Sequence, residues 1–82
     1  MEIGIEISLY PLHDEYREPI RQFIDRLNTH AGLRIVTNSM STQLFGPMEQ
    51  LWPMLGKEMG RTFTECDKAV CVMKVLGPLA AT

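Results

Sequence analysis

Strict alternation of apolar and polar residues between Glu2 and Tyr10 constrains this chain more than any other feature. The apolar positions are Ile3, Ile5, Ile7 and Leu9. A period of two places such residues on one face of a β-strand and the polar residues on the other face. Pro11 ends the strand because proline has no N–H to donate to a neighbouring strand. The chain therefore needs a second layer that covers the isoleucine row.

The next segment predicts a helix that begins between Tyr16 and Pro19, because proline is tolerated only near the start of a helix. Apolar residues then recur at helical spacing, at Ile20, Phe23, Ile24, Leu27 and Ala31. We expect the polar residues between them to lie on the solvated side, at Arg21, Asp25 and Arg26. Gly32 follows where a left-handed residue caps many helices.

Residues 33–46 predict two strands joined by a tight turn near residues 39–40. The register that keeps the aliphatic residues mostly together pairs Asn38 with Ser41, Val36 with Gln43, and Arg34 with Phe45. One face then carries Leu33, Ile35, Thr37, Thr42 and Leu44.

A second helix is expected to have Pro47 at its first position. Its expected buried stripe is Met48, Leu51, Trp52, Leu55 and Met59. Pro53 lies inside this segment and predicts a kink or a late start, because it removes one helical hydrogen bond. The last strand is expected over residues 68–76, with Ala69, Cys71, Met73 and Val75 turned inward.

The element order is therefore strand, helix, strand, strand, helix, strand. Right-handed crossovers convert this order into the α+β, ferredoxin-like β-α-β-β-α-β sandwich, a four-stranded antiparallel sheet with both helices on one face. The 82 residues form a single domain spanning 1–82. A domain of this size buries little surface, so a partner subunit that extends the core is expected.

Charge and composition exclude several classes of function. The net charge of −2 argues against a surface for nucleic acid or anionic membrane, because both require a basic patch. No segment reaches the length of a membrane span, and the first residues do not resemble a signal peptide. Two cysteines, Cys66 and Cys71, are too few for a disulfide scaffold, so we expect reduced thiols in a cytoplasmic protein.

The sequence gives no positive sign of catalysis. His13 and His30 are single histidines without a surrounding set of metal ligands, and no nucleophile has an obvious base beside it. We therefore expect no metal site, no catalytic residue and no cofactor.

The face of the predicted sheet that the helices leave open mixes hydrogen-bonding with apolar and aromatic groups. It carries Glu6, Ser8, Tyr10, Val36, Asn38, Ser41, Gln43 and Phe45, with Val70, Val72 and Lys74 from the last strand. Such a mixture is typical of a subunit interface or a ligand pocket. We expect mostly an interface, with any ligand site at its edge.

Several short motifs resemble the YkoF-like thiamine-binding proteins. They are residues 6–12 (EISLYPL), Tyr16, Pro19-Ile20, Phe23-Ile24 with Leu27, Gly32-Leu33, and residues 38–42 (NSMST) followed by Gly46. The resemblance implies a domain that forms a homodimer, often a homotetramer, and binds thiamine or its hydroxymethylpyrimidine half as a carrier or salvage factor without catalysis. The chain departs from the family at Pro53 and in its short, apolar ending after Val75.

An aminopyrimidine needs a carboxylate or an amide beside hydroxyl groups, and a thiazolium cation favours a carboxylate or an aromatic ring. We assign the carboxylate to Glu6 and the ring to Tyr10 or Phe45. The directional hydrogen bonds are assigned to Ser8, Asn38, Ser41, Thr42 and Gln43, although the register turns Thr42 toward the helices and only the resemblance favours it.

Other interpretations stay open at this point. Glu6 is equally suited to a cross-strand pair with Lys74, and the hydroxyls of Ser41 and Thr42 to turn and strand structure. The alternative function is a regulatory or structural oligomerisation domain that senses another small metabolite. An enzyme acting on a thiamine intermediate has only the family neighbourhood in its favour.

Overall fold

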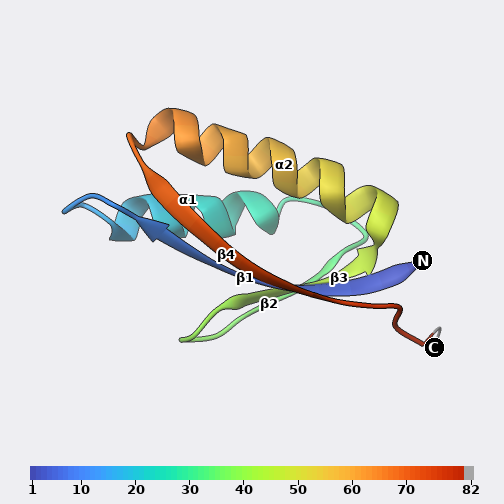
Figure 1. Cartoon of the computed structure of the whole chain (residues 1–82). Coiled ribbons are helices and arrows are strands. Elements are labelled where there is room, and N and C mark those ends of the chain that lie inside the picture. Colours follow the sequence, from blue (N-terminus) through green and yellow to red (C-terminus); the bar gives the residue numbers. More distant parts are fainter. Residues whose placement is uncertain (81–82) are drawn as a thin grey trace.

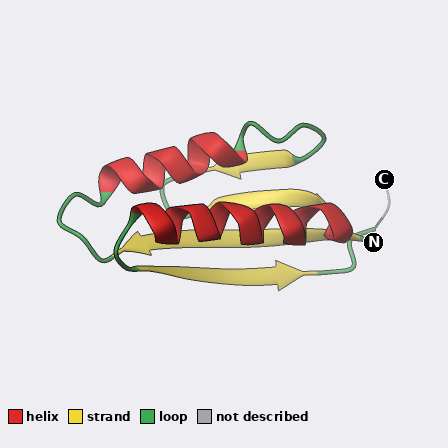
Figure 2. Ribbon diagram, turned by 90° about the horizontal axis from the view of Figure 1, so that it is seen from above, coloured by secondary structure: helices red, strands yellow, loops and turns green. Residues whose placement is uncertain are grey.

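The computed structural model describes residues 1–80 and contains the six expected elements in the expected order. They are β1 (Glu2–Pro11), α1 (Arg17–Leu27), β2 (Arg34–Thr37), β3 (Thr42–Pro47), α2 (Met48–Glu65) and β4 (Ala69–Leu76). The strands form one antiparallel sheet in the order β2-β3-β1-β4, and both helices cover the same face (Figures 1 and 2). The predicted ferredoxin-like fold is confirmed.

The predicted register between β2 and β3 is also confirmed. Val36 lies opposite Gln43 and Arg34 lies opposite Phe45. The Asn38 N–H donates to the Ser41 carbonyl across 3.0 Å and closes the turn. Thr42 and Leu44 are consequently buried under the helices, as the register required.

The isoleucine row of β1 forms the centre of the core. Ile3, Ile5, Ile7 and Leu9 are 1–8% exposed and pack with the fully buried Phe23, Leu27, Leu44, Leu51 and Leu55. Complete burial of one such side chain stabilises the fold by about 1.5–3 kcal/mol. Because side chains alternate along a strand, Glu6 and Ser8 lie on the face of the sheet away from the helices, as predicted.

The second helix differs from its prediction. It begins at Met48 and continues through Pro53, so the expected late start is wrong, and Pro47 is its N-cap and not its first residue. The buried residues are Leu51, Met54, Leu55, Glu58 and Thr62. Trp52 and Met48 are each 38% exposed and are not core residues. The buried stripe is rotated because α2 packs against α1 as well as the sheet.

Two smaller expectations also fail, and a third holds only in part. Helix α1 ends at Leu27, so Ala31 lies beyond the helix and is exposed. Gly32 does adopt a left-handed conformation, with φ of +84°, but in the turn before β2 and not at the helix cap. Val75 does lie on the helix side of the sheet as expected, because it is opposite Ile5, but it is 47% exposed on the edge strand β4 and lies outside the packed core.

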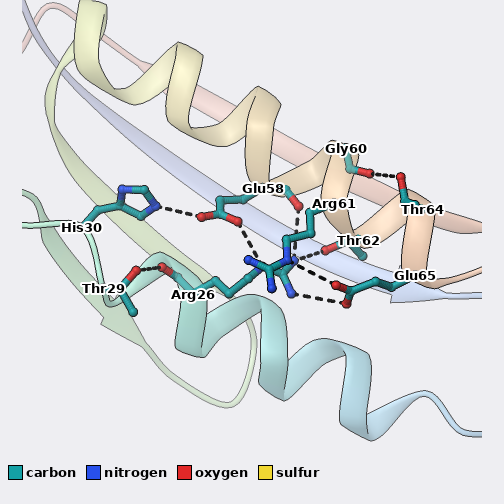
Figure 3. Close-up of polar contacts among 9 residues, drawn as sticks. All are labelled: Arg26, Thr29, His30, Glu58, Gly60, Arg61, Thr62, Thr64 and Glu65. Carbon is teal, nitrogen blue, oxygen red and sulfur yellow. Dashed lines mark hydrogen bonds and ion pairs between the residues drawn. The ribbon is translucent and has the colours of Figure 1, made fainter.

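Arg26 was expected on the solvated side of α1 and instead joins the two helices (Figure 3). Its side chain is 14% exposed, and its Nε donates to Glu58 Oε1 across 3.0 Å. Another nitrogen of the same guanidinium donates to Thr62 Oγ1 across 2.6 Å. His30 Nε2 lies 2.8 Å from the second oxygen of Glu58. The buried carboxylate of Glu58 thus has two partners, Arg26 from α1 and His30 from the turn after α1.

The balance of these effects fixes the ionisation of Glu58. Burial by itself would raise the pKa of this carboxyl group, whereas the hydrogen bonds from His30 and Arg26 and the charge of Arg26 lower the pKa. The net direction is downward, so Glu58 stays ionised between the helices.

The thiols of Cys66 and Cys71 are free. Burial raises the pKa of the Cys71 thiol, which was expected to face inward and is partly buried against the core. No helix within residues 1–80 is long and apolar enough to cross a membrane.

Candidate functional site

Residues 8–11 of strand β1 have a partner strand on only one side. It pairs with β3 from Glu2 to Ile7, and with β4 from Gly4 to Pro11. Beyond Ile7, the chain on the β3 side has already turned away into the loop of residues 38–41. The sheet therefore opens beside residues 8–11 of β1.

The hydrogen-bonding pattern shows which backbone groups face this opening. The Leu12 N–H donates to the Lys68 carbonyl, across 2.9 Å, on the β4 side. Because backbone groups of a strand point alternately to its two sides, the even-numbered residues of β1 bond β4 and the odd-numbered residues face β3. The N–H and C=O of Leu9 consequently point into the opening, and neither has a hydrogen-bond partner among residues 1–80.

A slot of about 180 Å³ lies at this opening, and we name it the edge slot. Its apolar wall comes from the core side, at Ile7, Leu9, Ile20, Phe23 and Ile24. Its rim comes from β1 and the β2–β3 turn and is mostly polar, at Ser8, Tyr10, Thr37, Asn38, Ser39, Met40, Ser41 and Thr42. Apolar walls with a few convergent polar groups are typical of small-molecule sites.

Several polar groups of the slot already have protein partners. The Asn38 side-chain oxygen accepts the backbone N–H groups of Met40 and Ser41, across 2.8 and 3.0 Å, and so holds the turn. Thr42 is 4% exposed, and its hydroxyl lies 3.1 Å from the hydroxyl of Thr37. The Ser8 hydroxyl makes a long contact of 3.4 Å with the Met40 carbonyl. Asn38 and Thr42 therefore have structural roles, whereas Ser8 is only weakly held.

The expected carboxylate lies on the open face of the sheet. Glu6 is opposite Gln43 on one side and Lys74 on the other, and the Ser41 hydroxyl donates to Glu6 Oε2 across 2.9 Å. Within the described part of the chain, Glu6 and Lys74 form no ion pair, so the cross-strand alternative is not realised. Ser41 connects the carboxylate with the edge slot, because its residue also lines that slot.

A second, wider hollow of about 430 Å³ lies on the open face and is named the face hollow. Its lining residues are Gly4, Ile5, Glu6, Gln43, Phe45, Lys74, Val75 and Leu76. The guanidinium carbon of Arg34 lies 4.1 Å from the centre of the Phe45 ring. A ligand cation would have to displace Arg34 to reach that face of the ring, so Tyr10, which is 54% exposed, is the better aromatic candidate.

The eight predicted site residues thus divide between two hollows. Ser8, Tyr10, Asn38, Ser41 and Thr42 line the edge slot, whereas Glu6, Gln43 and Phe45 line the face hollow. Sequence reasoning missed the Leu9 backbone and the α1 wall, because a free strand edge depends on where the neighbouring strand ends. No cluster of three metal-binding side chains occurs within residues 1–80.

Comparison with known proteins establishes the fold. Neither a protein-family model nor a curated protein sequence matches this chain. Among solved structures, a Streptococcus pneumoniae protein aligns with a TM-score of 0.89 and 22% identity, over 96% of this chain and 89% of its own. A Methanocaldococcus jannascii protein of hypothetical status aligns with a TM-score of 0.83 and 18% identity, over 99% and 84%.

A third solved structure carries a functional description. It is a protein from Thermotoga maritima, provisionally assigned to thiamine biosynthesis or salvage. It aligns with a TM-score of 0.86 and 12% identity, over 95% of this chain and 85% of its own. At these identities the likeness concerns the arrangement of the backbone and not the residues of a site.

Proposed function

We propose that this protein binds thiamine or its hydroxymethylpyrimidine half, as a carrier or salvage factor and without catalysis. The observation that carries the proposal is the edge slot, where the unpaired backbone of Leu9 faces an apolar wall from α1. The similarity in fold to a protein provisionally assigned to thiamine biosynthesis or salvage supports it, as does the resemblance of several short motifs to those of the YkoF-like proteins.

The pyrimidine half suits the edge slot chemically. An aminopyrimidine presents an amino donor next to a ring-nitrogen acceptor. The Leu9 C=O and N–H offer the complementary acceptor and donor on one strand edge. Each hydrogen bond of this kind contributes about 0.5–1.5 kcal/mol, and unpaired groups in a closed site would cost more. The faces of the flat ring would contact Ile24 and Phe23 on the apolar wall.

The cationic half of thiamine suits the polar rim. We assign the thiazolium ring to the side of the slot that leads through Ser41 to Glu6, whose carboxylate has no cationic partner among residues 1–80. The exposed ring of Tyr10 provides an aromatic face nearby in the same rim. A partly solvated charge pair contributes up to about 1 kcal/mol. Glu6 therefore distinguishes thiamine from the neutral pyrimidine.

Isothermal titration calorimetry with thiamine and with hydroxymethylpyrimidine tests the proposal. We expect both to bind, and a pyrimidine that lacks the amino group to bind at least tenfold more weakly, since it leaves the Leu9 carbonyl unpaired. This comparison changes only the ligand and requires no substitution in the protein. Absence of heat with either ligand at millimolar concentrations would contradict the proposal.

Two variants locate the cation. Glu6→Gln should weaken thiamine binding about fivefold, equivalent to about 1 kcal/mol, and leave hydroxymethylpyrimidine binding unchanged. Glu2→Gln is the matched control, because it removes the same charge from an exposed position on the same strand. Equal effects of the two variants on thiamine would remove Glu6 from the site.

A cytoplasmic location belongs to this proposal and rests on the two free thiols. The alternative function is a regulatory or structural oligomerisation domain that senses another metabolite, and the exposed valines of β4 favour it. The same titrations separate the two, because that domain would bind neither thiamine nor the pyrimidine.

A further inference from the structure

A third hollow, of about 400 Å³, lies near the start of β1, and we name it the end pocket. Figures 1 and 2 show the start of β1 and the residues after β4 at the same end of the sheet. The pocket is lined by two charged residues, Glu2 from β1 and Arg34 from β2, and by apolar residues that include Phe45 and Leu79. Within residues 1–80, no residue lines both this pocket and the edge slot. The end pocket is therefore a separate candidate site.

The apolar wall of the end pocket is held in place by close packing. Gly4 lies opposite Phe45 and has no side chain, so the Phe45 ring lies against the backbone of β1. A Cβ atom at Gly4 would be 3.1 Å from two ring carbons of Phe45 and 3.7 Å from Leu79 Cδ1. The Leu79 N–H donates to the Glu2 carbonyl across 2.8 Å and so holds the segment after β4 beside β1. This wall is therefore formed before any ligand arrives.

The cation of the pocket is held by the same ring. Arg34 lies opposite Phe45 on β2, and its guanidinium carbon is 4.1 Å from the centre of the ring. Within residues 1–80, Arg34 forms no ion pair. A guanidinium placed over an aromatic ring keeps its N–H donors at the edge of its plane, where they suit two parallel hydrogen bonds to a carboxylate.

Glu2 supplies the opposite charge on the other side of the pocket. It is exposed and has no cationic partner within the described residues. Because β3 lies between β1 and β2, the backbones that carry Glu2 and Arg34 are about 10 Å apart across the sheet. Glu2 repels a simple anion from this pocket, and Arg34 repels a simple cation. The pair of charges therefore favours a small molecule that carries both signs.

We propose that the end pocket binds a free α-amino acid with an apolar side chain. The Arg34 guanidinium donates two hydrogen bonds to the α-carboxylate, and the Glu2 carboxylate accepts hydrogen bonds from the α-ammonium group. The apolar side chain of the ligand lies against Leu79 and Ala80. The volume of the pocket falls in the range of small-molecule sites. This site goes beyond the proposed thiamine binding and does not depend on it.

An NMR titration of the isotope-labelled full chain with L-leucine tests the proposal. We expect saturable shifts of the amide signals of Arg34, Phe45 and Leu79, with a dissociation constant below about 5 mM. Leucinamide lacks the carboxylate, and 4-methylpentanoate lacks the amino group. Each should bind at least about tenfold more weakly, because each loses one charge-assisted interaction and keeps the charge that the pocket repels.

Substitutions of Arg34 test the carboxylate contact. Arg34→Gln should weaken leucine binding at least about tenfold, because the hydrogen bonds to a charged donor are lost. Arg34→Lys keeps the charge but not the planar pair of donors, so its affinity should lie between those of the wild type and Arg34→Gln. Arg17→Gln is the matched control, because Arg17 also lies over an aromatic ring, 5.9 Å from the centre of the Tyr16 ring, but does not line the pocket. It should leave leucine binding unchanged.

Glu2→Gln should have opposite effects on two of the ligands. It should weaken leucine binding about fivefold or more, because the partner of the ammonium group loses its charge. It should strengthen binding of 4-methylpentanoate, because a carboxylate that repels this anion is removed. A structural role of Glu2 alone would move both affinities in the same direction. Circular dichroism of each variant checks that it is folded.

Absence of saturable shifts at about 20 mM leucine would overturn the proposal. Equal affinities for leucine and 4-methylpentanoate, or equal effects of Arg34→Gln and Arg17→Gln, would also overturn it. The thiamine titrations give a separate result, because the edge slot shares no lining residue with the end pocket within the part of the chain that the structure describes. Failure of one proposal is therefore distinguishable from failure of the other.

Discussion

The buried ion pair between the helices allows the sharpest test of how this fold is held together. Replacement of Glu58 by Met removes a carboxylate that is 8% exposed and accepts hydrogen bonds from Arg26 and His30. The Arg26 guanidinium, 14% exposed, then stays buried without its closest counter-charge. Removal of one partner from a buried pair costs about 3–5 kcal/mol.

The lower end of that range applies here. Arg26 keeps a hydrogen bond to Thr62 and an ion pair of 3.7 Å with the half-exposed Glu65. We therefore expect Glu58→Met to lower the free energy of unfolding by about 3 kcal/mol. With an m value of about 1 kcal/mol per molar urea, the midpoint of urea unfolding should fall by roughly 3 M. The measurement requires one fixed protein concentration, because self-association would shift the apparent stability.

The double variant Arg26→Met, Glu58→Met is the matched control. It replaces both charges with apolar side chains, a change that is often close to neutral for a buried pair. Its cost should be at least about 1.5 kcal/mol smaller than the sum of the two single variants. A cost below about 1 kcal/mol for Glu58→Met, or additive costs in the cycle, would show that the pair does not hold the helices together.

Three further predictions concern stability. The pKa of Glu58 is lowered on balance in the folded protein, because the effect of burial is outweighed by its hydrogen bonds. The contribution of Glu58 to the free energy of unfolding is therefore complete above the unfolded-state pKa of about 4.3 and is lost as the pH falls through the folded-state pKa. Glu58→Gln should therefore flatten the acid limb of a pH–stability curve, and an unchanged limb would contradict this. Gly60→Ala should stabilise by about 0.5–1 kcal/mol in urea unfolding, because its helical position has open space for a methyl group. Gly32→Ala should destabilise by about 1–2 kcal/mol, because φ of +84° disfavours any side chain, and the same sign for both would refute the argument.

Local patterns predicted most of the fold. The alternation in β1 fixed which of its residues enter the core, since a strand has only two faces. The pairing of Val36 with Gln43 followed from keeping the aliphatic residues mostly on one side. Six of the residues assigned to the ligand site, Glu6, Ser8, Tyr10, Ser41, Gln43 and Phe45, lie on or beside the open face because the same register places them there.

The sequence predictions failed where the burial of a side chain depends on more than one neighbouring element. Helical spacing placed Trp52 and Leu51 in the same predicted buried stripe, and the packing of α2 against both α1 and the sheet decided that Leu51 is buried and Trp52 is not. Arg26 has the charge of a surface residue and is buried because α2 brings Glu58 to it. Phe45 was predicted to offer an aromatic ring to the ligand, but Arg34 from the neighbouring strand covers one face of that ring.

The sequence by itself determined the six elements, the direction in which each strand turns its side chains, and hence the open face. These properties depend on residues a few positions apart, whose relation the backbone geometry imposes. The free Leu9 backbone, the edge slot and the exposed side of β4 were decided by tertiary structure alone, because each depends on where a distant strand or helix ends, and no local period of the sequence records that.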